Sequence, residues 1–199
     1  MSEELASALA RPFLGRVVEI CIVTPDLKAT LTGLVRSGIG PFKIFHFRPD
    51  TVSNQEIYGK PATFEIDVAF ADVNSMVWEV MQPVSGHTVM QDFLDRTGQN
   101  GGIQHVAFDC SDINSATKDK QRPLLGDSVY TEAMERRKEF ESRGFPLAQS
   151  GVWKGRKGIC VFQFFDTTSA VNTCFETIVF SDDWEAPDGV EDFPPRTGI

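Results

Sequence analysis

The sequence predicts an α+β fold built from two matched βαβββ modules that face each other. Three observations predict it. Short apolar or alternating runs of strand length recur along the chain. A helical pattern follows the first strand of each half, with capping residues before it and glycine after it. The same order of one strand, one helix and three strands then appears twice.

Composition restricts the class of protein. The chain has 199 residues, of which 41% are hydrophobic, enough for the core of one domain or of two small fused modules. No run approaches the roughly 20 apolar residues that span a bilayer, so we expect a soluble, cytoplasmic protein. The net charge of −9 repels phosphate backbones and anionic lipids, which disfavours nucleic-acid and membrane partners. A small molecule is the expected partner.

The four cysteines are expected to be buried free thiols. Each stands alone within an apolar run, without a CxxC pair or a secretory signal. They are Cys21, Cys110, Cys160 and Cys174.

The pattern also sets the expected segment boundaries. We expect a short helical arm before the first module and an irregular tail after the second, which carries a polar insertion. The segments are an arm at 1–13, a first module at 14–86, a second module at 101–182 with an insertion at 111–126, and a tail at 183–199.

The first module opens with a buried strand and an amphipathic helix. Residues 17–23 are almost wholly apolar, and Glu19 interrupts them. Thr24, Pro25 and Asp26 then provide an N-cap, a first-turn proline and an early acid, and apolar residues recur at helical spacing until Gly38.

Three more strands complete this module. Residues 42–47 read as a strand and 48–60 as a polar loop. Residues 62–70 alternate, with Glu65 and Asp67 on the polar face, and we expect the apolar face to pack on the helix. Residues 76–81 form the last strand and place Glu79 beside Val77 and Met81.

The second module repeats this order. Residues 102–110 form a strand that carries His105 among apolar residues. A helix capped near position 127 or 128 ends near position 143, and three strands follow. They cover 147–153, 159–165 and 173–180, the last of which contains Glu176.

Four polar residues occupy equivalent places in these strands. Glu19 and Glu79 lie on the first and last strands of one module, and His105 and Glu176 on those of the other. If the modules face each other across a pseudo-twofold axis, these side chains converge. One imidazole and three carboxylates form a ligand set for a hard or borderline divalent cation, which would also offset the cost of burying the acids.

Several segments resemble one family. VVEICIVTPDL from residue 17, EVMQPVSG from 79, DFLDRTGQNGGIQHVAF from 92 and CFETIV from 174 resemble the vicinal oxygen chelate superfamily, which includes glyoxalases, bleomycin resistance proteins and dioxygenases. The likeness is nearest to the methylmalonyl-CoA epimerase and glyoxalase-like branch. It implies a cupped sheet around a central cavity. It also implies metal ligands at Glu19, Glu79, His105 and Glu176.

The resemblance implies chemistry at the carbon α to a carbonyl of a small oxygenated metabolite. A bound divalent ion (Mn²⁺, Mg²⁺, Co²⁺, Fe²⁺, Zn²⁺ or Ni²⁺) stabilises an enolate-like intermediate in this family. We expect an isomerase, epimerase or lyase. Glu176 is the expected base, and Glu65 or Asp67 is the second candidate. The family commonly has histidine or glutamine where this chain has Glu19, so the metal is left open.

A second hypothesis is a metal-free protein of the same fold that sequesters a small molecule. Its aromatic residues would shape the cavity, and its carboxylates would recognise a cationic ligand. Homodimers are common in this fold, so a homodimer is a further expectation.

Overall fold

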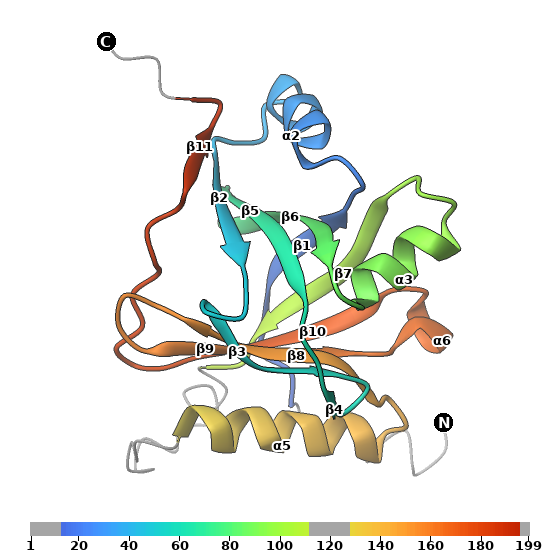
Figure 1. Cartoon of the computed structure of the whole chain (residues 1–199). Helices are drawn as coiled ribbons and strands as arrows, with labels where there is room; N and C mark the ends of the chain where they lie inside the picture. Colours follow the sequence, from blue (N-terminus) through green and yellow to red (C-terminus); the bar gives the residue numbers. More distant parts are fainter. Residues whose placement is uncertain (1–12, 112–127, 196–199) are drawn as a thin grey trace.

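The computed structural model of the chain describes residues 13–111 and 128–195, in which the strands form one strongly curved sheet (Figure 1). The predicted arm therefore lies almost entirely outside the described residues, as does nearly all of the predicted insertion. The strand order is β11-β2-β5-β6-β1-β7-β10-β9-β8-β3-β4. The two halves of the sheet join at the β1–β7 pair, and side chains from both halves share one buried cluster. This confirms the predicted fold class.

The first half of the sheet contains the predicted strand and helix order. β6 pairs in parallel with β1 and antiparallel with β5, which pairs antiparallel with β2. Its elements are β1 (Arg16–Val23), α2 (Leu27–Arg36), β2 (Phe42–Phe47), β5 (Glu65–Val73) and β6 (Met76–Ser85). The cap of α2 is Asp26 rather than Thr24, since the Asp26 carboxylate accepts a hydrogen bond from the Ala29 N–H at 3.0 Å.

The second half repeats the same pairing pattern. β7 pairs in parallel with β10, and β9 joins β10 to β8. The elements are β7 (Gly102–Asp109), α5 (Ser128–Ser142), β8 (Leu147–Lys154), β9 (Ile159–Phe165) and β10 (Cys174–Phe180). The antiparallel pair of β1 with β7 joins the two halves. Helices α2 and α5 lie on opposite outer faces of the molecule (Figure 1).

The expected loop at 48–60 is wrong. Residues in this segment form β3 (Val52–Ile57) and β4 (Lys60–Pro61), and β3 crosses from the first half to pair with the edge of β8. Val52 and Ile57 are buried there together with the polar Gln55, whose amide bonds both backbone groups of Phe64. The polar composition of the segment hid this strand because its partner is distant in sequence.

Three further elements were not predicted. Between the halves, α3 (Val89–Arg96) is capped by Thr88, whose hydroxyl accepts from the Gln91 N–H at 3.0 Å. A short helix, α6 (Thr168–Val171), precedes β10. In the tail, β11 (Glu191–Phe193) pairs with the edge of β2. The irregular segment that joins β10 to β11 runs along one side of both halves (Figure 1).

The faces of β5 are reversed relative to our expectation. Ile66 and Val68 point into the cup, whereas Ala69 and Ala71 contact the cluster of α2 residues that includes Leu31. The small alanine side chains let the helix approach the sheet closely. The outer face of β5 therefore also carries the polar residues of this strand.

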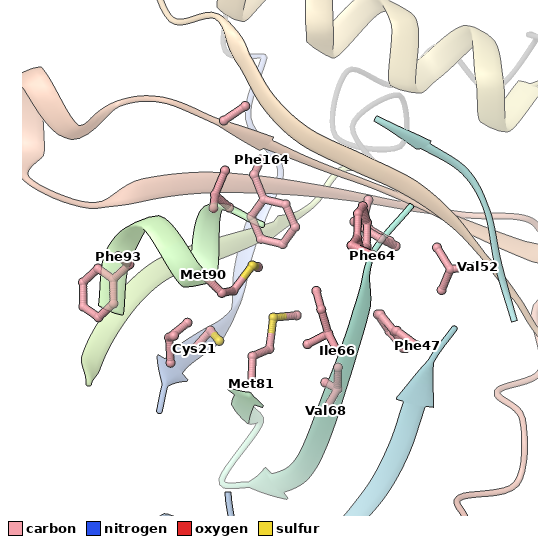
Figure 2. Close-up of a cluster of buried hydrophobic side chains, with 14 of the residues drawn as sticks. Cys21, Phe47, Val52, Phe64, Ile66, Val68, Met81, Met90, Phe93 and Phe164 are labelled. Atoms are coloured by element: carbon pink, nitrogen blue, oxygen red, sulfur yellow. The ribbon is translucent and has the colours of Figure 1, made fainter. Parts of the chain in front are cut away.

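Large apolar side chains fill one end of the cup. Figure 2 shows Met81, Ile66 and Val68 from the first half facing Phe164 from the second, with Met90 of α3 between them. All five are buried. This core fixes the distance between the halves. No helix in the described part of the chain is long and apolar enough to cross a membrane.

Candidate metal centre

Four buried polar side chains meet on the inner face of the sheet, one from each of the neighbouring strands β6, β1, β7 and β10. Each offers one ligand atom, and these atoms all lie within 4.8 Å of one another. The residues are Glu79, Glu19, His105 and Glu176, none of them more than 5% exposed. The structure therefore brings together the four residues predicted as metal ligands.

His105 lies at the centre of this cluster. Its Nε2 is 3.0 Å from Oε2 of Glu79, 3.2 Å from Oε2 of Glu176 and 4.0 Å from Oε1 of Glu19. Its Nδ1 lies 2.6 Å from Oε1 of Gln104. An amide oxygen only accepts, so Nδ1 donates to it. This leaves Nε2 to face the three carboxylates.

Burial and mutual repulsion perturb the acids. Burial, followed by the neighbouring Glu79 and Glu176 carboxylates, raises the pKa of Glu19 well above its usual range. Burial also raises the pKa of Glu176 to about 6, although His105 counteracts part of this effect. Burial lowers the pKa of His105, but Glu176 and Glu79 outweigh it and raise that pKa to about 9. When no metal ion is bound, protons on His105 and on the carboxyl groups therefore offset the repulsion among the buried acids.

One oxygen of the cluster has no hydrogen-bond partner. Nε2 of His105 carries at most one hydrogen, and that hydrogen is directed to Glu79. Oε2 of Glu176 is buried at 3.2 Å from the same nitrogen without a hydrogen bond. A buried carboxylate oxygen in this state depends on a nearby cation, which is protonated His105 in the absence of a metal ion. The donor set of three carboxylates and one imidazole suits a divalent ion, so these residues fit a metal.

Sequence reasoning missed two neighbours of the cluster. Gln104 orients the imidazole from the adjacent position in the same strand. Cys21 places its sulfur within the same 4.8 Å limit of ligand atoms in Glu79 and His105, although burial raises its thiol pKa well above the usual range and keeps it protonated. The apolar pattern around Cys21 predicted its burial as a free thiol, which the structure shows for all four cysteines.

Glu65 and Asp67, predicted as second candidates for the base, lie elsewhere. They occupy the outer face of β5, because the apolar face of that strand points into the cup. Asp67 is 2.7 Å from Nδ1 of His46 and 2.5 Å from the guanidinium of Arg48, which also lies 3.6 Å from Glu65. The placement of these two acids in the cavity is therefore wrong, and only Glu176 among the predicted catalytic residues lies in the cluster.

A cavity of about 70 Å³ is lined by the three carboxylates of the cluster. It lies between the two halves of the sheet, and its walls are aromatic and aliphatic. The lining residues are Glu19, Glu79 and Glu176, with Phe47, Phe70, Met81, Trp153, Cys160, Phe162, Ile178 and Phe180.

Trp153 spans the gap between the two halves. It belongs to β8, yet its ring lies 5.0 Å from that of Phe47 and 5.9 Å from that of Phe70, both in the first half. Trp184, which follows β10, contacts Trp153 at 5.2 Å and Phe180 at 5.4 Å. These rings determine the size of the space above the carboxylates.

Solved structures share this fold. A hypothetical protein from Bacillus halodurans C-125 is 15% identical, with 85% of this chain and 97% of that chain covered and a TM-score of 0.51. Methylmalonyl-CoA epimerase from Mycobacterium tuberculosis is 17% identical, with 85% of this chain and 91% of that chain covered and a TM-score of 0.50. A variant of Streptomyces coelicolor methylmalonyl-CoA epimerase in complex with 2-nitronate-propionyl-CoA is 16% identical. The match covers 87% of this chain and 99% of that chain, with a TM-score of 0.50. At such identities the likeness establishes the fold alone.

Sequence comparison gives the family. No curated protein matches the chain. A family model described as Glyoxalase/Bleomycin resistance protein/Dioxygenase superfamily matches residues 19–122, which is just over half of the chain and includes three of the four clustered residues. The chain belongs to the glyoxalase/bleomycin resistance protein/dioxygenase superfamily.

Proposed function

We propose that this protein is a metal-dependent enzyme that moves a proton at the carbon α to a carbonyl group, as an isomerase, epimerase or lyase does. One observation carries the proposal. Three carboxylates and an imidazole converge within 4.8 Å on the floor of a cavity, and Oε2 of Glu176 is left without a hydrogen bond. Membership of the superfamily and the shared fold with epimerases support the reaction class.

The four clustered residues and the cavity walls have different roles in this proposal. Glu19, Glu79, His105 and Glu176 would hold a divalent ion. Such an ion supplies a Lewis acid that stabilises negative charge developing on a carbonyl oxygen. The apolar walls exclude water from the cavity, which strengthens electrostatic interactions inside it. The identity of the ion follows from affinity and availability, since this donor set accepts several.

Glu176 is the proposed base. It lines the cavity, and its carboxylate could contact the ion through one oxygen and accept a proton from a substrate carbon with the other. In an isomerase or epimerase the same carboxyl group, or Glu19 across the cavity floor, returns the proton to a different position or face. In a lyase a bond adjacent to the carbanion breaks instead.

Metal analysis tests this proposal. The purified protein, incubated with Mn²⁺ and dialysed, should retain about one ion per chain by elemental analysis. His105→Ala should abolish retention. The matched control is His46→Ala, because His46 is also on a strand but its ring is exposed on the outer face beside Asp67. Full occupancy in His105→Ala would rule out the ligand role.

A metal-free binding protein is the second candidate. Five aromatic rings surround three carboxylates in the cavity, an arrangement that attracts organic cations. In that case purified protein would retain no stoichiometric ion, and tetramethylammonium would bind in the cavity and quench the fluorescence of Trp153.

A further inference from the structure

The chemistry of the cavity walls restricts what the site accepts. If the site acts on a carbonyl compound, as proposed above, the cavity walls decide which carbonyl compounds reach the four clustered residues. Apart from its three carboxylates, the cavity is lined by apolar and aromatic side chains and Cys160. Within the described residues no lysine, arginine, asparagine or glutamine is among the lining groups. An anionic group of a substrate would therefore find no protein cation to pair with.

The charge of the floor makes this restriction stronger. With a divalent ion bound, the imidazole is neutral and the three ionised carboxylates leave the centre with one negative charge in excess. Arg48, whose side chain is a quarter exposed, is already engaged by Asp67 and Glu65 on the outer face of β5. A desolvated anion in the cavity would be both unpaired and repelled.

The size of the space adds a second restriction. A cavity of about 70 Å³ is roughly half the volume of the engineered apolar cavity of about 150 Å³ that binds benzene. The ring of Trp153 limits it, because this ring contacts Phe45 at 5.3 Å as well as Phe47 and Phe70. Contact with Trp184 holds the Trp153 ring from its other side.

We infer that the site takes a small uncharged carbonyl compound with an apolar body, and that Trp153 sets its maximum size. Substrates with a free carboxylate or phosphate, including acyl-CoA thioesters of dicarboxylic acids, are excluded. The site thus differs in substrate class from the epimerases that share its fold, one of which is described in complex with a CoA thioester.

The test compares two probes of equal size. Diacetyl and pyruvate both have six non-hydrogen atoms and a methyl ketone, but only pyruvate is anionic. Saturation-transfer NMR measures the binding of each to full-length protein, with and without Mn²⁺, and methylmalonyl-CoA is the third probe. We expect diacetyl to bind at least about tenfold more tightly than pyruvate, a ratio that corresponds to only ~1.4 kcal/mol of anion cost. Equal or tighter binding of pyruvate or methylmalonyl-CoA, or no binding of diacetyl, would overturn the inference.

The size restriction is tested with Trp153→Ala and the milder Trp153→Phe. Both should admit 1-phenyl-1,2-propanedione, which the parent protein should bind at least about tenfold more weakly than diacetyl. Trp78→Ala is the matched control, because Trp78 packs in the cluster of α2 residues and does not line the cavity. Unchanged selectivity in both Trp153 variants would refute the role of this residue.

Failure of the proposed function gives a different result. If the protein retains no Mn²⁺ and no probe exchanges its methyl hydrogens with deuterated solvent, the enzyme proposal falls. The ratio of diacetyl to pyruvate binding is measured on the protein itself and still decides which class of ligand the cavity takes.

Discussion

Nδ1 of His105 lies 2.6 Å from Oε1 of Gln104, the residue directly before it in β7. Adjacent residues of a regular strand point to opposite faces. In β7, however, His105 is paired with Cys21 and Ile103 with Ile22, so Gln104 is the extra residue of a β-bulge. The bulge lets both side chains enter the interior and fixes the imidazole so that Nε2 faces the carboxylates.

Gln104→Leu should therefore weaken metal binding without removing a ligand. Loss of a hydrogen-bond partner to a ligating histidine typically costs about 10- to 100-fold in metal affinity. Gln104→Glu keeps an acceptor at the same place and should preserve the affinity. Competition titration with a chromogenic chelator measures both variants. Equal affinities for Gln104→Leu and the parent would show that Gln104 does not position the ring.

Metal binding should release protons and strengthen with pH. The pKa of His105 is raised to about 9, so at pH 7 an incoming ion must displace a proton from this imidazole. Below pH 9, each unit of acidification should then lower the apparent affinity about tenfold for each displaced proton. Calorimetry in two buffers of different ionisation enthalpy counts the protons. A proton count of zero at pH 7 would contradict direct ligation by His105.

Glu19→Gln should stabilise the metal-free protein while weakening metal binding. Because the pKa of Glu19 is raised in the folded state, its contribution to stability is greatest below about pH 4.3 and is lost as the pH rises toward the folded value. Glutamine does not titrate, so the gain should grow with pH and reach about 1–3 kcal/mol at pH 8.

Urea unfolding of both proteins from pH 4 to 8, in the presence of a chelator, measures this gain. Glu191→Gln is the control, because Glu191 pairs with Lys28 on the surface and exposed ion pairs contribute little. A gain that is independent of pH would show that the repulsion among the buried acids is not its source.

The sequence predicts the convergence of the four clustered residues because that result depends on strand order and alternation alone. Glu19 and Glu79 alternate with outward-facing apolar residues, and the repeated order places their strands beside those of His105 and Glu176. The bulge at Gln104 depends on how β1 and β7 pair, which no local pattern encodes. The position of β3 likewise depends on a partner strand about a hundred residues away in the chain.

The error on β5 has a similar cause. Alternation identifies two faces but does not say which face the helix covers. We expected the larger side chains of this strand to contact the helix. In the structure they fill the interior of the cup, and the small Ala69 and Ala71 contact the helix. As a result the acids Glu65 and Asp67 were placed on the wrong side of the sheet.

The reversed faces of β5 give a direct test of which acid moves the proton. Glu176→Gln keeps a side chain of the same shape over the cavity but removes the base, and it should reduce exchange of a substrate's α-hydrogen with deuterated solvent by about 100-fold or more. Glu65→Gln should leave the exchange rate within about twofold, since this residue lies on the outer face beside Arg48. Proton NMR follows the exchange for all variants at equal metal occupancy, measured by elemental analysis, so that loss of metal is not mistaken for loss of the base. If Glu65→Gln and Glu176→Gln lost exchange equally, the acid on the cavity floor would have no special role, and the proton would have to move by a route through the outer face of the sheet.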